Sequence, residues 1–311
     1  MKQKTKGDCI FLMSLTLCLI SFNSCKQETV EFQTNDCKSQ GAFIKKVGFD
    51  PARSALSTSE NRKMGLQLIQ FNAQGDTSNG GKKIYQHPSW KTAGWLGSIL
   101  IDPQGNCFVG PVPVINLLDN PPAKQNIIYK VDATSGEMKP FIELPVAKNT
   151  SPTNPYGILG FTYLCESNTI YVSTVHGSTR ETELGFIYAI DAATEKVIDK
   201  IQNTDVLGMG ISYITGKRKL YFGSARNSSI YSISLSKEGK FVNHPSLEFS
   251  ISDIGPRGDD KARRIKFDKI TGSMQIYAIE FNYNLTAPTE KQESIYNFSW
   301  NNDIQKWEYN K

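Results

Sequence analysis

The chain has 311 residues, of which 39% are hydrophobic, 11% aromatic and 21% charged, and this composition is typical of a folded globular protein rather than a disordered one. Its formal net charge is +5, and residues 1–24 contribute three lysines and one aspartate, so the remainder carries only +3. A balance this small provides no broad basic face, and it therefore argues against nucleic acid as a partner.

The first 24 residues have the pattern of an export signal. Three lysines precede an apolar run of 14 residues over 9–22. That run is too short to cross a bilayer core of about 30 Å as a permanent helix, which needs about 20 residues. The motif Phe22-Asn23-Ser24-Cys25 follows and resembles the lipobox of bacterial lipoproteins, although Asn23 departs from the small residue usual at its position. The resemblance implies that residues 1–24 are removed and that Cys25 is lipidated.

Residues 25–40 are then expected to form the lipidated end and a tether. Lys26-Gln27-Glu28 resembles the short signal that sends some Bacteroidetes-type lipoproteins to the cell surface, but any exposed linker can be rich in Lys and Glu. Several acyl chains on one residue anchor a protein stably, since each buried CH₂ contributes ~0.8 kcal/mol. We therefore expect a lipoprotein of the bacterial envelope, held on the outer membrane or at the cell surface, with residues 41–311 as one domain.

Three cysteines remain after Cys9, Cys18 and Cys25 are set aside. Cys37, Cys107 and Cys165 form no CxxC pair and show no metal-type spacing. Cys107 and Cys165 fall at equivalent positions of the repeat described next, so we expect buried or half-buried thiols there rather than a disulfide. The pairing state of the three is left open.

One pattern recurs four times, with an apolar stretch, a polar turn and an apolar-aromatic end, as in a β-hairpin. The four copies cover residues 97–109, 160–172, 210–222 and 264–278. A second hairpin follows each copy and begins at Ile127, Ile187, Ile230 and Ile295, with an earlier copy at Leu68. The aspartates Asp102, Asp132 and Asp191 recur directly after strand residues, and we interpret them as turn-forming residues rather than catalytic ones.

Each repeat thus predicts four short antiparallel strands. An isolated sheet of this kind cannot bury both faces, whereas radially arranged sheets cover one another. The predicted fold is therefore an all-β β-propeller of four-stranded antiparallel blades. Five blades are visible, with 45–57 as the candidate for the weak first hairpin, and a sixth could lie around residues 28–64.

Two segments resemble a known group of propellers. Residues 101–109 (IDPQGNCFV) are similar to the inner hairpin of NHL and SMP-30/gluconolactonase-type propellers, and 128–132 (IYKVD), followed by Gly136-Glu137, to their outer hairpin. The resemblance spans residues 65–311 and implies six blades as the commonest number. It also implies, for the lactonases of that group, a divalent cation held by Glu, Asn and Asp oxygens. Such a ligand should recur at the start of the inner strands. The predicted inner strands begin instead with Gly97, Gly160 and Gly210, which have no ligand side chain, and this counts against a lactonase.

The loops after second strands and the links between blades meet on one face, where a ligand site is expected. Arginines there could hold a carboxylate or phosphate, and aromatic rings could stack on a glycan. Ordinary solvated charge, and aromatic packing between blades, are the alternatives. The candidate ligand-binding residues are Trp95, His176, Arg180, Glu181, Arg226, Asn227, Arg263 and Arg264, with Tyr156 and Tyr283 as further aromatics.

The sequence contains no nucleophile elbow, HExxH, phosphate loop or dinucleotide motif. The first hypothesis is therefore a binding module without a cofactor, whose loop face takes a glycan, a peptide or an envelope protein. The alternative is an SMP-30-like lactonase or hydrolase that depends on Ca²⁺ or another divalent cation. It requires three or four oxygen ligands converging in the channel, and a channel lined by apolar residues and arginines would speak against it. A structural envelope subunit with a large apolar patch is a third hypothesis.

Overall fold

The structure is a computed structural model that describes residues 35–58, 63–71, 83–114, 117–146, 153–285 and 292–310. All of them belong to the compact unit Glu31–Lys311, and the chain's other unit is Met1–Val30. The predicted signal, the lipidation site Cys25 and residues 26–34 therefore lie outside the described residues. None of the helices in the described part of the chain has the length and hydropathy that a membrane crossing requires.

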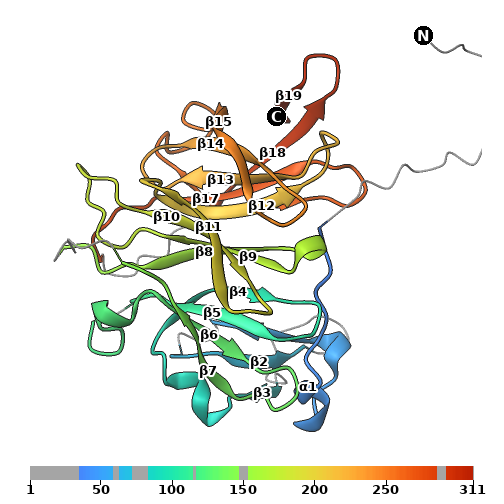
Figure 1. Ribbon diagram of the computed structural model, residues 1–311, viewed down its shortest axis with the longest axis vertical. Coiled ribbons are helices and arrows are strands. Elements are labelled where there is room, and N and C mark those ends of the chain that lie inside the picture. The colour runs from blue at the N-terminus through green and yellow to red at the C-terminus, as the bar shows by residue number, and fades with distance from the viewer. Residues whose placement is uncertain are drawn as a thin grey trace, which may run out of the picture. The chain divides into compact units, whose positions relative to one another are not determined.

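Five antiparallel sheets follow one another along the chain (Figure 1). Blade 1 has three described strands, β1 (Ser54–Ser57), β2 (Gln67–Gln70) and β3 (Lys83–Tyr85). Blade 2 has β4 (Leu96–Ile101), β5 (Cys107–Pro111), β6 (Ile127–Val131) and β7 (Met138–Glu143). Blade 3 has β8 (Ile158–Leu164), β9 (Thr169–Thr174), β10 (Phe186–Asp191) and β11 (Lys196–Gln202).

Blade 4 has β12 (Val206–Ser212), β13 (Lys219–Ser224), β14 (Ser229–Leu235) and β15 (Phe241–Ser250). Blade 5 has β16 (Lys261–Phe267), β17 (Met274–Ile279), β18 (Ser294–Asn301) and β19 (Lys306–Asn310). Short helices occupy some of the connections, namely α1 (Phe43–Lys46), η1 (Pro51–Arg53), η3 (Pro88–Lys91), η4 (Pro122–Lys124) and η5 (Cys165–Ser167).

The predicted all-β propeller is confirmed, with five blades. Strands pair in chain order within each blade, and the first strand of each blade, β1, β4, β8, β12 and β16, lines a central cavity. The first hairpin is β1–β2, whereas part of the predicted 45–57 hairpin forms α1 and η1 instead. The described part of residues 28–64 adds no sixth sheet.

Buried side chains lie between consecutive sheets, as a radial arrangement requires. Leu68 of blade 1 packs with Val109 of blade 2 in one core cluster. Three further clusters join blades 2 and 3, blades 3 and 4, and blades 4 and 5. Among the described residues, no core cluster joins blade 5 to blade 1. On the face of blade 5 that points away from blade 4, Lys266, Ile295 and Asn297 are exposed.

The recurring aspartates form turns, as predicted. Asp102 Oδ1 accepts a hydrogen bond from the Asn106 backbone N–H, Asp132 Oδ1 from that of Ser135, and Asp191 Oδ1 from that of Ala193. A short acceptor side chain at this position satisfies backbone donors that the tight turn leaves unpaired. These carboxylates therefore belong to the scaffold.

The inner strands approach one another so closely that several positions require glycine. A Cβ added at Gly160 would lie 2.8 Å from the Leu207 carbonyl oxygen, and one at Gly208 would lie 2.4 Å from the Arg263 carbonyl carbon. A Cβ at Gly210 would lie 2.6 Å from the Ile265 carbonyl oxygen. Glycine thus recurs on these strands because neighbouring backbones fill the space that a side chain would need.

Replacing Gly208 with alanine should lower the free energy of unfolding by about 1–3 kcal/mol, because the new methyl group meets backbone atoms that cannot rotate away. Chemical denaturation measures the change. The matched control is Thr162→Ala on the inner strand β8, which should change stability by less than about 0.5 kcal/mol. Equal stability of the two variants would contradict the close approach of β12 and β16.

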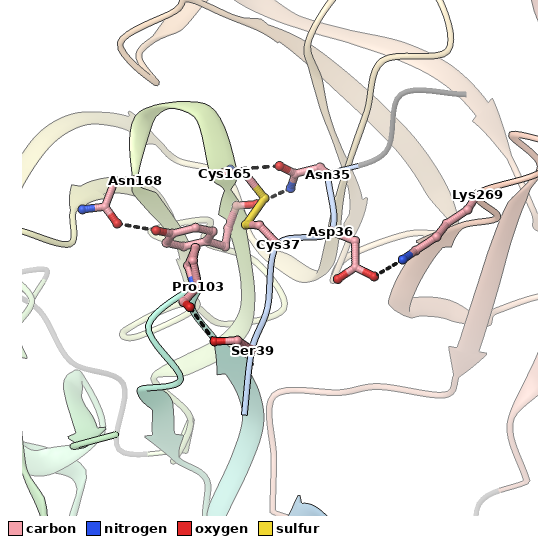
Figure 2. The surroundings of a disulfide bond; sticks show 9 residues. Asn35, Asp36, Cys37, Ser39, Pro103, Cys165, Asn168 and Lys269 are labelled. Atoms are coloured by element: carbon pink, nitrogen blue, oxygen red, sulfur yellow. Dashed lines mark hydrogen bonds and ion pairs between the residues drawn. A yellow bond between two sulfur atoms is a disulfide. The ribbon is translucent and has the colours of Figure 1, made fainter. Parts of the chain in front are cut away.

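The cysteine prediction was wrong for Cys165 and correct for Cys107. Cys165 forms a disulfide with Cys37, and their Cα atoms are 6.0 Å apart. Cys107 is a buried free thiol, and burial raises its pKa. The comparison of repeats could not find the disulfide because Cys37 precedes the repeats. It belongs to a segment, residues 35–39, that crosses the ends of several blades and is called the strap below (Figure 2).

Candidate functional site

The five inner strands and the strap line an open central cavity of about 680 Å³. Its lining mixes apolar, hydroxyl and charged side chains, for example Ile101, Thr162 and Lys266. This volume lies within the range of small-ligand pockets, about 300–1,000 Å³. The cavity is therefore the first candidate for a binding site.

The strap lies across the turn ends of blades 2, 3 and 5. Asn35 Oδ1 accepts a hydrogen bond from the Cys165 backbone N–H at 2.9 Å, and its Nδ2 donates to the Tyr163 carbonyl. Asp36 forms an ion pair of 2.5 Å with Lys269 in the turn after β16. The Ser39 backbone N–H donates to the Asp102 carbonyl oxygen at 3.2 Å. Figure 2 shows the contacts of Asn35 and Asp36 beside the disulfide, and residues 35–38 line the cavity, so the strap forms part of its wall.

Aromatic side chains on the opposite face pack among the loops. The Phe281 ring centroid lies 5.6 Å from that of Tyr156 and 5.5 Å from that of Tyr283. Tyr283 also packs with Leu159 of β8 and Leu207 of β12. The segment after β17 thus reaches residues of blades 3 and 4 on this face.

Of the predicted aromatic residues, Trp95 and Tyr283 are buried. The Trp95 indole N–H donates to Asp119 Oδ2 at 3.3 Å, and its backbone N–H donates to Asn120 Oδ1. Their rings pack within the protein, which favours packing between blades over stacking on a sugar ring.

The Arg226 guanidinium forms its hydrogen bonds within the protein. Its Nη1 donates to Asp205 Oδ2 at 3.0 Å and to the Thr179 carbonyl oxygen at 2.8 Å, and its Nη2 donates to the Arg180 carbonyl. Asp205 has a fully buried side chain and also accepts from the Tyr283 hydroxyl at 2.6 Å. Burial acts to lower the pKa of Arg226, but the hydrogen bond to Asp205 and the charge interactions with Asp205, Glu183 and Tyr283 together outweigh it, so that pKa is raised. Burial and the bond to Asp205 raise the pKa of Tyr283.

The neighbouring predicted residues stabilise their own loops. Asn227 Oδ1 accepts from the Ser229 backbone N–H at 2.9 Å, and Glu181 Oε2 accepts from the Thr179 hydroxyl at 2.9 Å. Arg180 contributes its carbonyl to Arg226, and its side chain is exposed. These residues lie on loops, as predicted, but the side chains of Asn227 and Glu181 bond within the scaffold.

His176 is 8% exposed, and its Nδ1 is buried without a hydrogen-bond partner among the described residues. Its backbone N–H donates to Thr174 Oγ1 at 3.2 Å. Burial lowers the pKa of His176, so the imidazole is neutral at pH 7.

Acidification should destabilise the protein through His176. The unfolded chain takes up a proton at this residue as the pH falls below about 6.5, whereas the folded chain does so only at lower pH, so stability is lost as the pH falls. The melting temperature of His176→Gln should therefore fall less than that of the wild type between pH 7 and pH 5.5. The control is His244→Gln, an exposed position on β15 that should keep the wild-type profile. Identical profiles for all three proteins would contradict a buried, neutral His176.

Arg263 and Arg264 differ from the other candidates because they line the cavity. Both pair with Glu293, Arg263 at 3.3 Å through Oε1 and Arg264 at 2.5 Å through Oε2. The Arg264 guanidinium also lies 4.5 Å from the Tyr277 ring centroid. The sequence did not single out their companions in the lining, Lys38, Lys266 and Lys269. Lys38 belongs to the strap and Lys269 pairs with Asp36 of the strap, and no local sequence pattern predicts that the strap docks there.

The oxygen ligands that the lactonase hypothesis requires are not found in this lining. Among the described residues that line the cavity, Asp36 is the carboxylate and Asn35 the carboxamide, and both bind other groups of the protein. The described part of the chain also contains no group of three or more His, Cys, Asp or Glu side chains placed to hold a metal ion. In proteins, Ca²⁺ takes six to eight oxygen ligands. This lining therefore does not fit such an ion.

Comparison with known proteins assigns the chain to no family. No protein-family model matches the sequence, and no curated protein matches it significantly. Among solved structures, a luciferin-regenerating enzyme is 9% identical, with 90% of each chain covered and a TM-score of 0.46. A glucose dehydrogenase is 12% identical over 83% of this chain and 79% of that one, with a TM-score of 0.43. An endo-arabinase from Bacteroides thetaiotaomicron is 14% identical over 69% and 78%, with a TM-score of 0.40.

Proposed function

We propose that this protein is a lipid-anchored lipoprotein, exposed at the bacterial cell surface, whose propeller binds a ligand in its central cavity. The observation that carries the binding role is the cavity itself, which has about 680 Å³ and a mixed polar and apolar lining. Sites of this kind combine apolar walls with a few polar groups that orient the ligand.

We place the ligand in the cavity rather than on the loop face because the charged side chains of the loop face pair with one another. Arg226 and Asp205 bind each other and their neighbours, and Tyr283 is 6% exposed. By contrast, Arg263 and Arg264 lie in the cavity wall with about half of each side chain exposed. A ligand can therefore reach these side chains without breaking the packing of the blades.

The binding role can be tested by thermal shift on the full chain in mild detergent. The compounds are a panel of neutral and anionic sugars and organic acids. At least one compound should raise the melting temperature, and Thr162→Trp should abolish that rise because the indole fills the cavity. Val242→Trp, at an exposed position on β15, is the matched control. No rise with any compound, or the same rise in Thr162→Trp, would refute the cavity as the binding site.

The anchor rests on the sequence around Cys25 and has a separate test. In cells fed a labelled fatty acid, the wild type should be labelled and enter the detergent phase, and Cys25→Ser should not be labelled. Cys107→Ala keeps Cys25 and should behave as the wild type. Wild-type protein without label that still carries residues 1–24 would refute the anchor.

A further inference from the structure

We infer that the ligand of the central cavity is an anion, a carboxylate or a phosphate, held by cations of β16 and of the strap; this inference rests on the proposed function. Five of the residues that line the cavity are cationic, namely Lys38, Arg263, Arg264, Lys266 and Lys269. Asp36 is the carboxylate among the described lining residues, and its ion pair with Lys269 neutralises one of the five. Glu293 pairs with both arginines and offsets one more charge, so three positive charges remain. The remaining positive charge favours an anion.

The blade-5 cations lie together on one face of the sheet. Arg264 pairs with Tyr277 in the ladder, and Lys266 Nζ lies 4.9 Å from the same ring. Ile265, between them in the strand, is buried against blade 4. Alternation along a strand therefore places both cations on the face that points away from blade 4, where Ile295 is 52% exposed. Like charges held this close repel each other unless an anion lies between or beside them.

Glu293 already shows how an anion binds there. One carboxylate contacts two guanidinium groups, with Oε1 on Arg263 and Oε2 on Arg264. Guanidinium groups favour such two-pronged contacts with carboxylates and phosphates. A ligand oxyanion can therefore take the place of Glu293, and Glu293 competes with it.

The strap completes the site from the other side. Lys38 belongs to the strap, and the ion pair between Asp36 and Lys269 joins the strap to blade 5. The disulfide from Cys37 to Cys165 joins it to blade 3. The cations of the site thus come from the two ends of the chain, and the docked strap is what brings them together.

Titration calorimetry at constant ionic strength tests the inference, with citrate as the carboxylate probe, inorganic pyrophosphate as the phosphate probe and sorbitol as the neutral control. Lys266→Gln and Arg264→Gln should each weaken anion binding about tenfold, the effect of one lost charge-assisted contact. Glu293→Gln should strengthen it, because the two arginines lose their internal partner. Lys196→Gln, at an exposed position on β11, should leave the affinity unchanged.

Binding of citrate alone assigns a carboxylate ligand, and binding of pyrophosphate alone assigns a phosphate ligand. Failure of both probes to bind overturns the inference, and so does equal weakening in Lys266→Gln and Lys196→Gln. A neutral sugar that binds the wild type and is lost in Thr162→Trp, with no response to either anion, overturns the inference but leaves the proposed binding role intact. A cavity that binds no compound of either kind overturns both.

Discussion

Replacing Arg226 with alanine should lower the free energy of unfolding by about 3 kcal/mol, the lower end of the cost of breaking a buried ion pair. Asp205 has a fully buried side chain, and Arg226 is the cation that neutralises it at 3.0 Å. The carboxylate would keep donors from Tyr283 and Ser178, each at 2.6 Å, which is why the cost stays at the lower end. Urea denaturation of the wild type and the variant measures the difference.

The same substitution should release the loop that contains Arg180. Arg226 donates to carbonyl groups of Thr179, Arg180 and Thr182, so its loss removes three bonds that hold this loop. Limited trypsinolysis should then cleave after Arg180 faster than in the wild type.

Arg53→Ala provides the matched control for both measurements. Arg53 pairs with Asp50 at 2.8 Å, but both side chains are more than two-fifths exposed. Such a pair contributes about 0–1 kcal/mol. If Arg226→Ala costs no more than Arg53→Ala and leaves trypsin cleavage unchanged, the network around Asp205 does not stabilise this face.

The blades could be predicted from the sequence because their information is local. Hairpins such as β4–β5 place apolar stretches on both sides of a polar turn, and Asp102 or Asp191 fixes the turn through a neighbouring backbone N–H. Repetition of that unit then determines how the sheets must cover one another. The steric role of Gly208 and Gly210 is not local, since it arises from a different blade.

The candidate site was only partly predictable for the same reason. Arg263 and Arg264 stood out as a pair, and they do line the cavity. Arg226 stood out equally, yet its partner Asp205 lies 21 residues earlier on a different loop. Cys37 pairs across 128 residues, and no pattern in the sequence distinguishes Cys165 from Cys107 as its partner.

Removing the disulfide with Cys37→Ser/Cys165→Ser should lower the free energy of unfolding by about 2–5 kcal/mol. The bond closes a loop with a sequence separation of 128 residues, so its loss gives the unfolded chain much more freedom. Residues 35–39 would keep a few hydrogen bonds and one partly exposed ion pair, which contribute little by themselves. The release of this segment should also weaken citrate or pyrophosphate binding, because Lys38 leaves the cavity wall.

Dithiothreitol provides the control, since two electrons and two protons convert the disulfide into two thiols. Wild-type protein in dithiothreitol should melt at the temperature of the double variant, and the reductant should not change the variant itself. Alkylation in denaturant without reductant should modify Cys107 and spare Cys37 and Cys165. Alkylation of all three, or a wild type whose melting is insensitive to dithiothreitol, would show that this bond does not hold the N-terminal segment against blade 3. The cationic cavity would then have to be complete without Lys38.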